Sequence, residues 1–202
     1  DQAEINNHPT QLIGGTVGPG DIKYVNQPNV YGVYDDVIDT NDRVPIGNPT
    51  TPEIVYGFGP SFHYKGFDFS FFFQGIAKTS LFMSGLQPFG TTMDNKNVQT
   101  FIAEDHWSPD NQNIFAKYPR LTIERSANNA TTSTYWERDG AFLKLKNAEI
   151  GYTFKSMRFY LRGSNLLTFS KFKLWDPEQG GGNGLKYPTQ RVFNIGFQMT
   201  IK

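Results

Sequence analysis

The sequence of 202 residues has no cysteine, no long apolar run and no net charge. The lack of cysteine excludes a disulfide framework and thiolate zinc sites. A transmembrane helix is excluded because no stretch of about 18 apolar residues occurs. The balance of 19 basic and 19 acidic residues gives no reason to expect nucleic-acid binding. The chain opens without a signal peptide, in polar sequence from Asp1 to Thr10, which is more typical of the middle of a loop.

Aromatic residues are abundant, with 18 Phe and 10 Tyr, and many of them occupy alternate positions. Between Arg191 and Lys202 the odd positions are apolar, apart from the first, and the even positions are mostly polar. Such alternation places the two sets on opposite faces of a β-strand. A membrane-crossing strand needs about 9–11 residues, whereas strands of soluble domains usually have about 5–6. Length and alternation together predict the wall of an outer-membrane β-barrel, apolar toward lipid and polar toward the lumen.

Two earlier segments, 53–64 and 67–74, alternate in the same way and are separated only by Lys65-Gly66. A two-residue connection predicts a hairpin. Because proline cannot donate a ladder hydrogen bond, we expect a bulge near Gly59-Pro60. The expected register pairs Tyr64 with Phe67, Phe62 with Phe69, Gly59 with Phe72, and His63 with Asp68 as a lumen-side ion pair.

Two more strands are expected before the last one. In the third strand Ile150 lies on the apolar face, but Leu145 has the opposite parity. This change predicts either a bulge or a segment standing above the membrane. Pairing Phe154 with Phe159 in the fourth strand aligns the apolar sets and predicts a four-residue turn, 155–158.

Short turns alternate with long connections along this chain, as in outer-membrane barrels, where short turns are periplasmic and long loops extracellular. The expected fold class is all-β, with about five antiparallel strands. Because five strands cannot close a barrel, the chain is expected to be a fragment or one piece of a larger assembly. The expected organisation is an extracellular loop (1–51), a hairpin (52–76), a long extracellular loop (77–140) and the last three strands (141–202).

Several segments, in order and covering essentially the whole chain, resemble the C-terminal part of SusC/RagA-type TonB-linked (TonB-dependent) outer-membrane transporters. These segments are Gly20–Tyr24, Asn41–Pro49, His106–Asn111, Tyr118–Leu121, Phe142–Asn147 continuing through Gly151–Phe154, and Gly163–Leu167.

The resemblance implies a 22-stranded barrel of which this chain would supply strands 18 to 22. It implies an internal plug domain, absent from this chain, and uptake of glycans or peptides in Bacteroidetes-type bacteria. The implied partners are the remaining N-terminal barrel and plug, a SusD-like surface lipoprotein acting as a lid, TonB through the plug region, and lipid or lipopolysaccharide. The implied location is the bacterial outer membrane.

Five residues in the expected extracellular segments are candidates for contact with the substrate or with the lid. Flat aromatic rings beside polar groups hold sugar rings or peptides, although packing within the loops is an alternative role. These candidates are Trp107, Tyr135, Trp136, Arg138 and Trp175.

An acidic run in the first loop offers oxygen ligands of the kind that Ca²⁺ takes. The candidate ligands are Asp35, Asp36, Asp39 and Asp42, but their spacing does not match an EF-hand. The related acidic loop of the family has an Asp-Gly pair that this run lacks. A solvated acidic loop is therefore the preferred interpretation over a Ca²⁺ site.

Catalysis is not expected. The three histidines are far apart in sequence without metal-ligand spacing, and no nucleophile triad or carboxylate pair stands out. A soluble β-sandwich module that binds carbohydrate is the main alternative, with its apolar faces packed sheet on sheet. A barrel enzyme is a weaker alternative.

Overall fold

The structure, a computed structural model, describes residues 1–84, 98–123 and 126–201, so parts of the expected loop 77–140 lie outside the described residues. It divides into two compact units. The first contains Asp1–Ile46 and Ser84–Trp136, and the second contains Gly47–Met83 and Glu137–Lys202. In the described ranges, no helix has the length and apolar character needed to cross a membrane.

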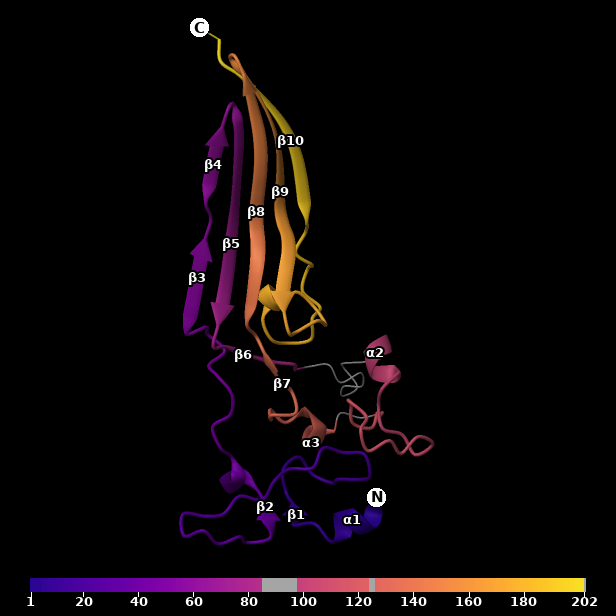
Figure 1. Ribbon diagram of the computed structural model, residues 1–202. Helices are drawn as coiled ribbons and strands as arrows, with labels where there is room; N and C mark the ends of the chain where they lie inside the picture. The colour runs from indigo at the N-terminus through magenta and orange to yellow at the C-terminus, as the bar shows by residue number, and fades with distance from the viewer. Residues whose placement is uncertain (85–97, 124–125, 202) are drawn as a thin grey trace. The chain divides into compact units, whose positions relative to one another are not determined.

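The second unit is built on an antiparallel sheet in the order β10-β9-β8-β5-β3, with β4 also paired to β5 (Figure 1). This all-β arrangement confirms the expected fold class. The strands are β3 (Ile54–Phe58), β4 (Ser61–Tyr64), β5 (Phe67–Ala77), β8 (Phe142–Phe154), β9 (Met157–Ser170) and β10 (Val192–Met199).

The first hairpin has the expected register, with Tyr64 opposite Phe67. Lys65 and Gly66 both have positive φ, 46° and 85°, as a type I′ turn requires. The predicted bulge at Gly59-Pro60 is wrong. The pairing ladder breaks there because Pro60 has no N–H, but the register is the same on both sides of the break.

The predicted four-residue turn at 155–158 is also wrong. Phe154 pairs with Met157 and Tyr152 with Phe159, which leaves a two-residue connection. A shift of two residues keeps every side chain on its own face, so apolar alternation alone could not distinguish the two registers. Lys155 adopts the positive φ of 53° that the tight turn needs.

A bulge in β8 accounts for the change of parity between Leu145 and Ile150, which confirms the first of the two expected explanations. Phe72 pairs with Asn147 and Phe73 with Leu145, so that Lys146 is the additional residue. The neighbouring strand β9 also shifts register at this level. There Asn165 has a φ of 54°, a conformation that asparagine tolerates better than most residues.

A small sheet and a short 3₁₀ helix complete the second unit. Strand β6 (Ser80–Phe82) pairs with β7 (Glu137–Asp139), and η2 spans Pro177–Gln179 in the connection between β9 and β10. The backbone N–H of Gly182 donates to the carbonyl of Phe82 at 2.9 Å, which ties that connection to β6.

The first unit folds residues expected as loop around a small core. Its elements are α1 (Gln2–Asn6), β1 (Thr10–Gln11), β2 (Val37–Ile38), η1 (Thr40–Asp42), α2 (Thr100–Ala103) and α3 (Ala127–Ala130). Strands β1 and β2 pair in parallel. The buried apolar side chains are Ile22, Ile38, Ile102, Tyr118 and Trp136.

Candidate functional site

One face of the large sheet is apolar across all of its strands. Cross-strand pairs on this face join Phe58 to Phe73, Phe69 to Ile150, Leu161 to Ile195 and Phe159 to Phe197. Ring stacking reinforces it, with ring centroids 5.3 Å apart for Phe58 and Phe73 and 5.0 Å apart for Phe159 and Phe197.

This apolar face is open to the surroundings. The exposed fraction is 39 % for Tyr152, 57 % for Phe62 and 89 % for Ile195. In a soluble sandwich the same side chains would be packed against a second sheet. An uncovered apolar face of this width is expected only where lipid or another protein covers it.

The opposite face carries an ion network close to the short turns. The Arg158 guanidinium donates to both carboxylate oxygens of Asp68 and, at 2.6 Å, to Glu149. His63 lies opposite Asp68 as expected, but the structure pairs Asp68 with Arg158. Sequence spacing could not reveal this partner, because Arg158 is 90 residues away and arrives through β9.

A second ion network lies at the other end of β8, where the β9–β10 connection begins. The Lys144 side chain is 1 % exposed, and its Nζ lies 2.5 Å from Asp176 and 2.7 Å from Glu178. Lys146 adds a bond of 2.6 Å to Glu178. Burial is the largest single influence on both carboxyl groups and raises the pKa, but hydrogen bonds and charge interactions, those with Lys144 first among them, together outweigh burial and lower both pKa values. The network therefore fixes residues 171–190 to the sheet.

Replacing Lys144 by methionine should release this connection. Asp176 would lose its cation and Glu178 would keep only Lys146. We expect cleavage within 171–190 by an added protease to accelerate about tenfold, equivalent to about 1.4 kcal/mol. Lys171→Met is the matched control, since that lysine is 86 % exposed in its pair with Asp139 and should change cleavage little. Equal cleavage of the two variants would show that Lys144 does not hold the connection.

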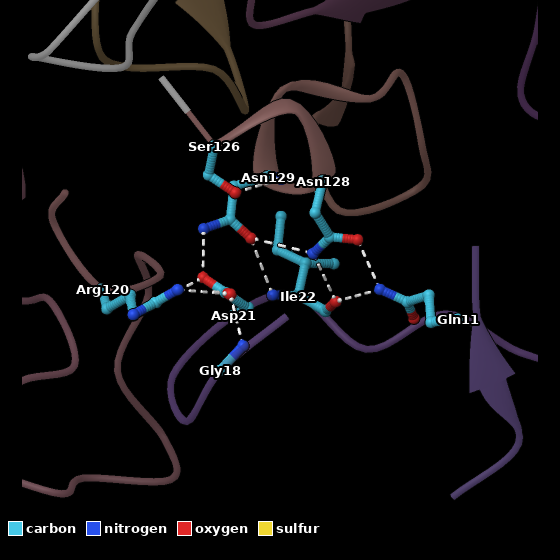
Figure 2. A network of polar contacts seen from close by, with 8 residues as sticks. All are labelled: Gln11, Gly18, Asp21, Ile22, Arg120, Ser126, Asn128 and Asn129. Atoms are coloured by element: carbon cyan, nitrogen blue, oxygen red, sulfur yellow. Dashed lines mark hydrogen bonds and ion pairs between the residues drawn. The ribbon is translucent and has the colours of Figure 1, made fainter. Parts of the chain in front are cut away.

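In the first unit, a polar network joins residues near 20 to Arg120 and to residues 126–129 (Figure 2). The Asp21 carboxylate accepts from Arg120 Nε and Nη2 at 2.7 and 2.9 Å and from the Asn129 amide at 2.8 Å. Asn129 in turn accepts from the Ile22 backbone N–H at 2.8 Å. Asn128, which is fully buried, donates to the Ile22 carbonyl at 2.9 Å. The hydrogen bonds from Arg120 to Asp21 raise the pKa of Arg120.

Two open pockets adjoin this network, and Trp107 lines both. The larger, about 440 Å³, is also lined by His106 and Arg120. The smaller, about 220 Å³, is lined by Asp21 and Tyr135. A half-buried indole beside hydrogen-bonding groups suits a sugar ring or an apolar side chain. The structure thus brings Trp107 and Tyr135 together, as two of the five sequence candidates for ligand contact.

The other three candidates do not line these two pockets. Trp136 is 6 % exposed, and its indole N–H donates to the Asn129 carbonyl at 2.7 Å, so its role is packing in the first unit. Arg138 belongs to β7 in the second unit. Trp175 packs edge to face on Phe172 with ring centroids 4.6 Å apart.

Three of the four aspartates predicted as candidate Ca²⁺ ligands accept hydrogen bonds from nearby backbone N–H groups. The Asp42 carboxylate accepts hydrogen bonds from the backbone N–H groups of residues 27 and 39, and the Asp35 carboxylate accepts one from the N–H of Val37. Asp39 caps the start of η1. Within the ranges that the structure describes, no three acidic or histidine side chains converge in a way that could hold a metal. Asp35, Asp39 and Asp42 therefore support the local loop structure, and the Ca²⁺ site stays a prediction.

Sequence reasoning missed the Asp21–Arg120 and Lys144–Asp176 pairs. Their partners are 99 and 32 residues apart, and no periodic pattern links them. A signal did exist for Asp21 and Arg120, because both belong to the segments that carry the family resemblance.

Comparison with known proteins finds relatives of this chain among TonB-dependent receptors. No protein-family model matches it. Two curated relatives from Formosa agariphila are TonB-dependent receptor P26, 30 % identical over 83 % of this chain, and TonB-dependent receptor P3, 32 % identical over 80 %. The chain spans about a fifth of the length of these relatives, 19 % and 18 % respectively.

Solved structures share its fold. The RagAB peptide importer in its open-open state matches 90 % of this chain and 21 % of the solved chain, with a TM-score of 0.65 and 22 % identity. A RagAB peptide transporter structure matches 86 % of this chain and 20 % of the solved chain, with a TM-score of 0.64 and 24 % identity. The two receptor relatives, at least 30 % identical over most of this chain, show that it belongs to the TonB-dependent receptor family and corresponds to one part of such a receptor, and the solved structures share its fold.

Proposed function

We propose that the chain forms the C-terminal wall strands and extracellular loops of a TonB-dependent importer in the bacterial outer membrane. The observation that carries this proposal is the exposed apolar face, which continues across every strand of the sheet opposite a polar face. Lipid would cover the first face, and the second would line the lumen. The receptor relatives support transport in preference to catalysis.

The arrangement of connections supports an orientation. Two-residue turns join β4 to β5 and β8 to β9, whereas long connections join β5 to β8 and β9 to β10. In outer-membrane barrels the short turns are periplasmic, so the first unit and residues 171–190 would lie outside the cell. There they would face a SusD-like surface lipoprotein that acts as a lid. The rest of the barrel, its plug and TonB would complete the machinery.

The cargo we propose is a peptide or a glycan. The RagAB relatives in fold are peptide importers, which supports the first class. The pockets beside Trp107 accommodate either class.

Growth and uptake of the source bacterium test this function. A strain without the complete receptor gene and a strain without TonB should both lose uptake of the same labelled cargo, offered separately as peptides and as oligosaccharides. Restoring the receptor gene should restore uptake. Unchanged uptake of both cargo classes in the receptor deletion would overturn the proposal, and the cargo that is lost would identify the substrate class.

A further inference from the structure

A loop of the first unit presents bare apolar side chains at its tip. We call residues 29–34 the aromatic tip. Val30 is 93 % exposed and Tyr31 is 87 % exposed, and Val33 and Tyr34 are also more than half exposed. Large apolar side chains grouped in this way usually mark an interaction surface.

The aromatic tip is held in one conformation by Asn29. Its side-chain oxygen accepts from the backbone N–H groups of Tyr31 and Val33, at 2.9 and 3.1 Å. Its backbone N–H donates to the Val33 carbonyl at 2.9 Å, and its carbonyl accepts from Gly32 at 2.9 Å. At the base, Gln27 N–H donates to Asp42 at 2.6 Å. A loop fixed before binding loses little conformational entropy when a partner covers it.

The same design occurs a second time in the first unit. Asn113 accepts from the Phe115 backbone N–H at 2.9 Å and presents Ile114 and Phe115, which are 84 % and 83 % exposed. Both tips therefore have the same order of residues in sequence: an asparagine, an aliphatic residue and an aromatic residue. A repeated device in one compact unit favours a common role over chance exposure.

Charge narrows the choice of partner for the aromatic tip. Residues 24–42 contain four aspartates and neither lysine nor arginine, and Asp35 and Asp36 are exposed directly beside the tip. An anionic lipid surface attracts basic segments, so it would repel this one. A second copy meeting tip to tip would bring like charges together. A surface that complements the tip in both polarity and charge is an apolar pocket rimmed by lysine or arginine.

We propose that the aromatic tip docks into such a basic-rimmed apolar pocket on the surface lipoprotein, with the Asn113 tip as a second anchor. This inference rests on the proposed function, which supplies the lipoprotein partner. Val30 and Tyr31 fill the pocket, Asn29 keeps them in place, and Asp35 and Asp36 attract the basic rim.

Binding of the purified complete receptor to the purified SusD-like lipoprotein, measured in detergent, tests the proposal. The double variant Val30→Ser with Tyr31→Ser should bind at least tenfold more weakly. Asp35→Lys with Asp36→Lys should slow association at low salt and much less at high salt. The matched control is Leu12→Ser with Val44→Ser, because these exposed residues of the same unit lie outside the tip and should leave binding unchanged.

Labelling provides a second measurement that does not depend on affinity. Because the chain has no cysteine, Val30→Cys introduces a single thiol into it. The thiol should react in the receptor alone and become protected when the lipoprotein is added. A thiol that is already protected in the receptor alone would overturn the proposal, since the receptor itself would cover the tip. Equal binding by wild type and the Val30/Tyr31 variant would overturn only the proposed role of the aromatic tip. If the wild-type receptor does not bind the lipoprotein, the proposed partnership is overturned as well.

Discussion

Replacing Ile195 by arginine should strongly impair insertion of the receptor into the outer membrane. Ile195 lies in the middle of β10, pairs with Leu161, and is 89 % exposed on the apolar face. An arginine on the lipid face costs about 2–4 kcal/mol near the bilayer midplane. We therefore expect a large loss of folded receptor from the outer-membrane fraction, measured as heat-resistant barrel on gels run without boiling.

The adjacent residue provides the control. Asn194 lies on the polar face of the same strand, opposite Arg162, and is exposed. Asn194→Arg adds the same side chain one position away, where water would solvate it and screen its repulsion with Arg162, so folded receptor should be largely retained. If both variants fold equally well, the apolar face does not meet lipid and the proposed barrel wall is incorrect. If both fail equally, β10 tolerates no large side chain on either face.

Alternation of apolar and polar residues was sufficient to predict the strands of the large sheet and their faces, but not the short strands β1, β2, β6 and β7. Along each strand, side chains two residues apart lie on the same face, so the apolar ones meet across neighbouring strands, as Phe69 meets Ile150 and Phe159 meets Phe197. That same property limited the prediction. A register shifted by two residues looks identical to the pattern, so the turn after Phe154 was assigned four residues in place of two.

The first unit could not be predicted from periodicity. Its described helices are at most five residues long and its described strands only two, so little periodic signal exists. Its order comes from particular side-chain bonds, such as those of Asp21 to Arg120 and of Trp136 to the Asn129 carbonyl. Partners of this kind are set by tertiary structure, and Pro/Gly punctuation alone predicts only that the segment is irregular.

Replacing Asp21 by alanine should unfold the first unit while the sheet stays folded. The Asp21 side chain is 3 % exposed and its carboxylate accepts four hydrogen bonds, from the Gly18 N–H, the Asn129 amide and two nitrogens of Arg120. Breaking a buried ion pair costs about 3–5 kcal/mol, and we expect about 3 kcal/mol because Arg120 is partly exposed. Amide hydrogen exchange at residues 18–24 should then accelerate about a hundredfold.

Two further variants separate charge from shape. Asp21→Asn keeps the size of the side chain but turns an N–H₂ group toward donors, so it should accelerate exchange nearly as much as alanine. Asp110→Ala removes an exposed aspartate of the same unit and should leave exchange unchanged. If Asp21→Ala behaves like Asp110→Ala, the apolar core around Ile22 and Trp136 is sufficient to hold the unit. If exchange in β8 and β9 accelerates as well, the two units do not unfold independently. The expected result, fast exchange confined to the first unit, would mean that one carboxylate keeps two long loops folded together, because it satisfies donors from both of them at once.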